Sequence, residues 1–264
     1  MITDFQKQPL LANTNMYLLD YFSTWHILTI FVLLLPITPL PGAQVDTSNN
    51  PVMSFNVNRY WDTRHKTSTT LQSGGDKGLS EEENKAFYFI RIGRLLEIIR
   101  AIHGENHHLS ILDAGCGKGL FTNALRQCGY HVVGIDSSPT AIEYALEEFG
   151  GEFLVEDLTS YRHYQLFDVV ICIDVLFHLV DDEQWRHAFC NLASACKSSG
   201  SFIFTDSLEQ ERREQGDYIV HRSREDYEQL IAGNGLRLRD FSGYKFGCNL
   251  NGFAVVTSVV WGEK

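Results

Sequence analysis

Glycines and an acidic residue are closely spaced in the segment Asp113-Ala114-Gly115-Cys116-Gly117-Lys118-Gly119, which follows a short apolar stretch. Glycine lets the backbone turn sharply and approach a ligand closely, and a helix starting after the turn would point amide donors at that ligand. A dinucleotide site needs the spacing G-x-G-x-x-G, whereas position 120 is Leu. Asp113 would repel a pyrophosphate and would tolerate an ammonium group. The spacing therefore favours a cationic cofactor over NAD, although such a turn alone is often only a tight connection.

Two further acids follow the next apolar stretches. Asp136 comes directly after residues 131–135, and Asp157 follows residues 152–155. A carboxylate at the tip of the second strand of an open parallel sheet can accept hydrogen bonds from a ribose diol, and Asp157 could accept one from an adenine amino group. Each acid also has an ordinary interpretation. Asp136 could cap the helix that begins near Pro139, and Asp157 could be a loop residue.

Histidines supply the candidates for a general base. His178 follows the fourth apolar stretch, and an ordinary imidazole titrates around pH 6–7, which suits proton transfer from a hydroxyl. It could instead only order the turn in which it lies. His221 is the second candidate, next to Arg222 and Arg224, which could hold an acidic acceptor. Alternatively, Ser223 caps a helix and the two arginines face solvent.

Strand-like and helix-like segments alternate from Leu79 onwards. We expect helices after the capping box at Ser80 and over 121–128, 140–149, 182–197 and 224–233. We expect strands over 108–113, 131–135, 152–155, 167–173, 201–205, 236–241 and 253–260. This alternation predicts an α/β fold of the doubly wound, Rossmann-like type, with a mostly parallel seven-stranded sheet and helices on both faces.

Taken together, the motifs resemble those of the class I S-adenosylmethionine-dependent methyltransferases over about residues 79–262. The resemblance implies S-adenosyl-L-methionine as cofactor and a division of roles among the site residues. The methionine part would lie against Asp113, Gly115, Cys116, Gly117, Gly119 and Ile173, the ribose against Asp136 and Ser137, and the adenine against Asp157 and Leu158. It also implies that the aromatic segment 59–65 covers the cofactor, although ordinary packing of its aromatic residues would serve equally well.

The implied enzyme transfers a methyl group to a small-molecule acceptor, at oxygen or else at nitrogen, with His178 and His221 as catalytic candidates. The Asp/Asn-Pro-Pro-aromatic motif of nucleobase methylation is missing. No pair of the six cysteines has CxxC spacing, and Ser207 follows Asp206 where a metal-dependent type would need Asn, so we expect no metal. Two alternatives remain open: a protein or peptide methyltransferase, and a cofactor-binding protein without turnover.

Composition and net charge limit the classes of partner that the protein can bind. With 44% hydrophobic and 21% charged residues the chain is globular, and its net charge of −11 disfavours nucleic acid. The oligomeric state does not follow from the sequence.

Residues 1–52 differ from the rest, and we expect the methyltransferase domain to span 53–264. An apolar run over 25–35 is followed by Pro36, Pro39 and Pro41 and is too short to span a bilayer as a helix. The extension could be a membrane anchor, an imperfect signal or an over-called start before Met53, or alternatively a hydrophobic helix packed on the main domain. Several of the six cysteines lie in apolar runs, as reduced, core-packed thiols do, so we expect a cytoplasmic protein. It could associate with a membrane through residues 25–43.

Overall fold

A computed structural model describes residues 55–247 and 249–259. The helices are α1 Val57–Thr67, α2 Thr70–Ser73, α3 Glu81–His103, α4 Leu120–Gln127, α5 Pro139–Phe149, the short 3₁₀ turn η1 Leu176–His178, α6 Asp182–Ser194 and α7 Arg224–Gly233. The strands are β1 Ser110–Ala114, β2 His131–Asp136, β3 Glu152–Val155, β4 Phe167–Cys172, β5 Cys196–Asp206, β6 Arg213–Gln215, β7 Ile219–His221, β8 Leu236–Gly243 and β9 Gly252–Ser258.

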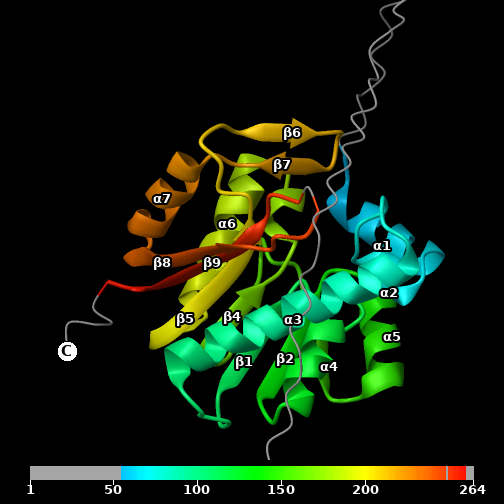
Figure 1. Cartoon of the computed structure of the whole chain (residues 1–264), viewed down its shortest axis with the longest axis horizontal. Coiled ribbons are helices and arrows are strands. Elements are labelled where there is room, and N and C mark those ends of the chain that lie inside the picture. Colours follow the sequence, from blue (N-terminus) through cyan, green and yellow to red (C-terminus); the bar gives the residue numbers. More distant parts are fainter. Residues whose placement is uncertain (1–54, 248, 260–264) are drawn as a thin grey trace, which may run out of the picture. The chain divides into compact units, whose positions relative to one another are not determined.

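The predicted seven-stranded, mostly parallel sheet is confirmed (Figure 1). Its strand order is β3-β2-β1-β4-β5-β9-β8, with β9 antiparallel to both of its neighbours. The order reverses between β1 and β4, which pair in parallel, and this reversal creates the crevice in which open α/β sheets bind ligands. The two largest core clusters of the described residues contain alternate residues of the central strands, so both faces of the sheet are covered.

Local signals in the sequence explain where the helices begin. Ser80 and Glu83 form the predicted capping box at the start of α3, and Ser223 forms another with Asp226 at the start of α7. Ser138, rather than Asp136, caps α5, with Pro139 at its first position. The Ser138 cap fixes the point at which the chain leaves the carboxyl end of β2 and enters α5.

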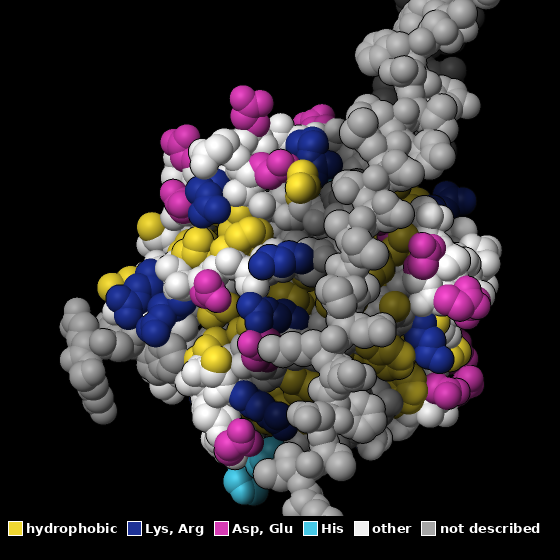
Figure 2. All heavy atoms as spheres, in the orientation of Figure 1, with side chains coloured by type: hydrophobic (Ala, Val, Ile, Leu, Met, Phe, Trp, Pro, Cys, Tyr) yellow, Lys and Arg dark blue, Asp and Glu magenta, His cyan; other side chains and the backbone are white. Residues whose placement is uncertain are grey.

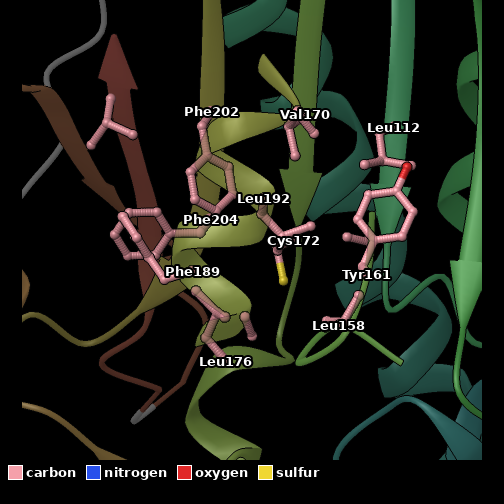
Figure 3. Packing of buried hydrophobic residues seen from close by; sticks show 14 of the residues in the cluster. Leu112, Leu158, Tyr161, Val170, Cys172, Leu176, Phe189, Leu192, Phe202 and Phe204 are labelled. Atoms are coloured by element: carbon pink, nitrogen blue, oxygen red, sulfur yellow. The ribbon is translucent and has the colours of Figure 1, made fainter. Parts of the chain in front are cut away.

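The sheet packs on large apolar side chains of one continuous cluster (Figure 3). Leu112 of β1, Val170 and Cys172 of β4, and Phe202 and Phe204 of β5 point to the same side. On that side they meet α6, whose Phe189 lies 5.1 Å from the ring of Phe202, centroid to centroid. Burial of this kind contributes about 1.5–3 kcal/mol for each large side chain. The central strands therefore form a firm base for the loops at their ends.

Several elements differ from the sequence prediction. β5 has 11 residues instead of the expected five, because its first part continues directly from α6, which ends at Ser194. The hairpin of β6 and β7 was not predicted, since three-residue strands show no periodicity. In Figure 1 this hairpin lies at the same end of the molecule as α1 and α2. Tyr60 of α1 and Tyr218 of the hairpin stack with ring centroids 5.3 Å apart.

The apolar stretch 25–43 and the boundary at residues 52 and 53 lie outside the described residues. Within residues 55–247 and 249–259, no helix combines the length and the apolar character that crossing a membrane requires.

Candidate functional site

A narrow cavity of about 110 Å³ lies where the carboxyl ends of β1 to β4 meet α1 and α2. It brings together nine of the twelve residues that the sequence analysis assigned to the site. These are Gly115, Cys116, Gly117, Asp136, Ser137, Asp157, Leu158, Ile173 and His178. Asp113, Gly119 and His221 do not line this cavity.

Two of the loop glycines are required by packing. Gly115 and Gly119 have φ values of 78° and 81°, in the region that favours glycine. A Cβ on Gly115 would lie 2.4 Å from the Val175 side chain, and one on Gly119 would lie 2.9 Å from the Phe153 ring. These two positions therefore let the loop fit against its own protein neighbours.

Gly117 faces a different neighbour. Its φ is 54°, and the nearest atom to a Cβ placed there belongs to His65 of α1, at 3.4 Å. His65 is buried and its Nδ1 has no hydrogen-bond partner. Burial lowers the pKa of His65 to about 4, so this imidazole is neutral near pH 7. Helix α1 therefore covers the open side of the glycine loop with an uncharged ring.

Asp136 ties the loop to the second strand. Its carboxylate accepts hydrogen bonds from the Gly117 amide and the Ser138 amide, both at 2.9 Å. Burial raises the pKa of Asp136 above its ordinary value, and these two amides partly oppose that change. Each carboxylate oxygen can accept a further hydrogen bond, so the residue could still receive a ribose hydroxyl.

Asp157 lies under the roof formed by α1. Its Oδ2 accepts a hydrogen bond from Asn58 Nδ2 at 2.9 Å, and its Oδ1 accepts bonds from the amide and hydroxyl of Thr159 at 2.8 and 2.7 Å. These donors hold the pKa of the Asp157 carboxyl below its ordinary value, although partial burial acts in the opposite direction. Leu158 next to it is buried and lines the same cavity.

Asp113 lies beneath the glycine loop and is only 2% exposed. The Thr122 hydroxyl of α4 donates a hydrogen bond to its Oδ2 at 2.5 Å. Burial raises the pKa of Asp113 to about 7. The side chain therefore links β1 to α4 and lies behind the cavity wall.

Arg91 and Asp174 form an ion pair that the sequence analysis missed. Asp174 follows β4 with a φ of 56°, and its Oδ1 accepts a hydrogen bond from Tyr244 at 2.8 Å. Arg91 is 1% exposed, lies on α3 between Phe87 and Leu95, and its Nη2 has no hydrogen-bond partner. The sequence signal that could have revealed the pair is a charged residue, Arg91, on the apolar face of a helix. A buried charge of this kind is stable only when an opposite charge compensates it. The partner is 83 residues away in the chain.

His178 lies where two cavities meet. It ends η1, lines the narrow cavity and also lines a larger one of about 670 Å³. Its Nδ1 lies 2.9 Å from the backbone oxygen of Tyr218. A carbonyl oxygen only accepts, so Nδ1 carries the proton and Nε2 of the neutral ring keeps its lone pair. Burial lowers the pKa of His178 to about 4, which differs from the value of 6–7 expected from the sequence.

His221 lines only the larger cavity. Its Nδ1 lies 2.5 Å from Asp206 Oδ1 at the end of β5. The other oxygen of Asp206 accepts a hydrogen bond from Tyr227 at 2.8 Å. Asp206 therefore fixes the orientation of the His221 ring and directs Nε2 away from the carboxylate.

The two arginines near His221 lie elsewhere. Arg222 is buried against α6, where its Nη2 donates to Asp182 at 2.9 Å, and Arg224 is the first residue of α7. Neither lines either cavity, so the expectation that they hold an acidic acceptor is wrong. The alternative is correct for Ser223, which caps α7, but wrong for Arg222, which is 1% exposed and does not face solvent.

Within residues 55–247 and 249–259, no group of three or more His, Cys, Asp or Glu side chains is placed to hold a metal ion.

The central part of the chain matches known proteins. Residues 111–200 match the sequence model of a family described as "Methyltransferase domain". The chain is 31% identical over 121 residues to the ubiquinone biosynthesis O-methyltransferase of Rickettsia canadensis, covering 44% of this chain and 50% of that protein. It is 35% identical over 124 residues to the enzyme of that name from Rickettsia akari, covering 44% and 47%. The chain thus spans about half the length of the curated relatives it matches.

Solved structures share the fold. The magnesium protoporphyrin IX methyltransferase of Synechocystis PCC 6803, solved with bound S-adenosylmethionine, has a TM-score of 0.62 at 16% identity, covering 78% of this chain and 99% of that one. The N-methyltransferase NodS of Bradyrhizobium japonicum, solved with S-adenosylhomocysteine, has a TM-score of 0.58 at 16% identity, covering 78% and 100%. These likenesses confirm the predicted Rossmann-like fold.

Proposed function

We propose that this chain, which carries a methyltransferase domain in residues 111–200, transfers a methyl group from S-adenosylmethionine to a hydroxyl oxygen of a small molecule. The observation that carries the proposal is the position of His178 at the junction of two cavities. One cavity contains the glycine loop and Asp136, and the other is large enough for a small-molecule acceptor. The curated relatives are named as O-methyltransferases of ubiquinone biosynthesis, which supports oxygen as the acceptor atom.

The residues around the narrow cavity fit the proposed cofactor. Arg91 Nη2 is a buried donor without a partner, and the carboxylate of a methionine moiety would satisfy it. Asp136 would accept hydrogen bonds from the ribose hydroxyls, and Asp157 with Leu158 would flank the adenine. Gly115, Cys116, Gly117, Ser137 and Ile173 complete the wall. Asp113 and Gly119 would act from behind it by supporting the loop.

The chain's own residues would orient the acceptor and take up a proton. The bound cofactor supplies a methyl group on a sulfonium sulfur, so no covalent intermediate with the protein is needed. His178 presents Nε2 with a lone pair at the junction, and this nitrogen would accept the hydroxyl proton. His221, held by Asp206, would contact the acceptor from the larger cavity. Trp61 of α1 packs edge-on against His178, with centroids 4.6 Å apart, and would keep water from the reacting atoms.

Binding and transfer are tested separately. Calorimetry of the full chain should show binding of S-adenosylhomocysteine and none of NAD, and comparable NAD binding would contradict the cofactor assignment. The protein is then incubated with methyl-labelled cofactor and a cell extract that is afterwards divided by size. Label in the small-molecule fraction supports the proposal. Label in protein would favour a protein or peptide methyltransferase, and cofactor binding without any transfer would favour a binding protein without turnover.

The setting of the enzyme is part of the proposal. We infer a cytoplasmic protein that associates with a membrane through residues 25–43, because that segment contains the apolar run of residues 25–35. Flotation of the full chain with liposomes tests this association, and recovery of the protein only in the liposome-free bottom fraction would contradict it.

A further inference from the structure

The larger cavity carries an excess of positive charge that contrasts with the rest of the molecule. Four cationic side chains line it, against two carboxylates; these are Arg64, Lys77, Arg91 and Arg213, against Asp76 and Asp174. The whole chain has a net charge of −11. On the face shown in Figure 2, acidic and basic side chains are interspersed. A local field of the opposite sign to the net charge attracts anions into the cavity.

Two of these cations are compensated. Arg91 forms its ion pair with Asp174, inside the cavity wall. Arg213 of β6 lies 3.3 Å from Glu209, and both side chains are about 40% exposed. Arg64, Lys77 and Asp76 remain, so the two cations without an ion pair exceed the remaining carboxylate by one charge.

Arg64 is a buried cation without an acidic partner. Its side chain is 7% exposed, and its Nη2 donates to the backbone oxygens of Gln72 and Gly75 at 2.8 and 2.6 Å. Its Nε is buried and has no hydrogen-bond partner, and the guanidinium carbon lies 4.9 Å from the ring of Trp61. No carboxylate in the described part of the chain lies within ion-pair distance of it. A buried charge without a counter-ion is costly, and an anionic ligand in the cavity would offset this cost.

Lys77 lies at the exposed mouth of the same cavity. Its Nζ donates to the Tyr60 hydroxyl at 3.0 Å and lies 5.2 and 6.0 Å from the ring centroids of Tyr60 and Tyr218. The adjacent Asp76 uses its Oδ1 to accept the Gly78 amide. Within the described ranges, Lys77 also has no carboxylate within ion-pair distance. Stacked tyrosines thus hold an ammonium group where an incoming ligand would pass it.

The remaining walls are aromatic. Trp61, Phe87, Phe177, Tyr218 and Phe246 line the cavity, and His178 lies at its junction with the narrow one. Flat aromatic walls favour a planar ring by stacking and edge contacts. His178, the base candidate, could contact one polar group on that ring. Arg64 and Lys77, the cations without an ion pair, could contact another.

We propose that the larger cavity binds a hydroxylated aromatic carboxylic acid, with the hydroxyl towards His178 and the carboxylate at Lys77 and Arg64. This inference rests on the proposed function and specifies the class of its acceptor. A carboxylate matches the available donors, because Arg64 already uses Nη2 on two backbone oxygens and Lys77 offers a point charge.

The test measures binding, so that it does not depend on turnover. The full chain is saturated with S-adenosylhomocysteine and titrated calorimetrically at pH 7.5 with two matched pairs of probes. These are 3,4-dihydroxybenzoate with 3,4-dihydroxybenzamide, and 4-hydroxycinnamate with its amide. In each pair an uncharged amide of similar shape replaces the carboxylate, and we expect at least one acid to bind about tenfold more tightly than its amide, the factor typical of one charged hydrogen bond.

Variants then show which cationic side chain binds the carboxylate of the probe. Lys77→Met should remove most of the preference for the acid, whereas Lys85→Met, which removes the same charge from an exposed position on α3 outside both cavities, should leave it intact. Arg64→Met should act like Lys77→Met if its thermal midpoint shows that it folds. The proposal is overturned if acids and amides bind equally, if neither member of either pair binds, or if Lys85→Met has the same effect as Lys77→Met. The proposed function fails separately, through absence of S-adenosylhomocysteine binding or of label transfer.

Discussion

His178 is the residue on which the proposed proton transfer depends. Replacing it with Ala should lower turnover by about 10²–10⁴-fold, the usual contribution of a general base, and should leave the affinity for S-adenosylhomocysteine nearly unchanged. Turnover measured with labelled cofactor, together with calorimetry, distinguishes these effects. A decrease of less than severalfold would make His178 a structural residue. An equal loss of cofactor affinity would mean that it shapes the narrow cavity.

The lowered pKa of His178 also predicts a pH profile. Since burial lowers its pKa to about 4, the imidazole is neutral, and therefore able to act as a base, at every pH well above that value. We therefore expect that titration of His178 does not lower turnover near pH 6–7. Any fall in turnover of the parent enzyme in that range should also be present in the His178→Ala variant. Rates measured between pH 5.5 and 8 test this. A limb near 6.5 that disappears in the variant would show that the ring is less buried in the working enzyme.

Ionisation of the Asp113 carboxyl should lower the stability of the folded protein as the pH rises. Its carboxyl has a pKa of about 7 when folded and about 4 when unfolded, so between these values the folded state binds more protons. Its contribution is present below pH 4 and is lost as the pH rises towards 7. Asp113→Asn should therefore gain stability relative to the parent by an amount that grows over this range, up to the order of 4 kcal/mol. Urea unfolding of both proteins at pH 5 and 8 measures the change, and a constant difference would contradict it.

Among the elements, α1 controls access to the narrow cavity. The cavity's 110 Å³ is below the range of about 300–1,000 Å³ typical of ligand sites. Asn58 of α1 already donates a hydrogen bond to Asp157, and His65 of α1 already lies against Gly117. We infer that α1 moves outwards when a cofactor binds, as an active-site lid does.

Asp62 ties this lid to α5, and its removal tests the motion. Its Oδ1 accepts hydrogen bonds from the Ser138 hydroxyl at 2.8 Å and the Thr140 amide at 3.3 Å. Asp62→Ala should raise both the association and the dissociation rate of S-adenosylhomocysteine several-fold, as followed by tryptophan fluorescence in a stopped-flow instrument. Glu97→Ala, which breaks an exposed ion pair with Arg94 on α3, is the control and should change neither rate. Unchanged rates in Asp62→Ala would mean that α1 is a fixed wall.

Elements that depend on local signals could be predicted, and those that depend on distant contacts could not. The glycine loop was identifiable because a buried strand, a turn and a helix follow one another within a few residues. The position of α1 was expected only from the family resemblance. The Arg91–Asp174 pair joins α3 to the end of β4 and leaves no local pattern. The bonds of Asp157 to Asn58 and of His178 to Tyr218 likewise link segments 99 and 40 residues apart.

At the scale of the whole molecule, we expect residues 1–52 to be dispensable. Residues Val52–Lys264 form a compact unit of their own, so the sheet and both cavities should form without the extension. A chain that begins at Met53 should match the full chain in thermal midpoint and in affinity for S-adenosylhomocysteine. As a control, a chain that begins at Thr69 lacks α1 and should bind the cofactor more weakly. Aggregation of the chain beginning at Met53 would make the apolar segment part of the fold.

The position of β9 has a consequence for biosynthesis. This strand lies between β5 and β8, yet it follows every other strand of the described residues. While a ribosome is still making residues 252–258, the backbone groups of β5 on that side have no partner. An unpaired strand edge readily associates with another chain. The nascent protein therefore passes through a stage in which the half of the sheet that carries the glycine loop can be folded while the edge of β5 is still unpaired. Protection by a chaperone would matter most at that stage.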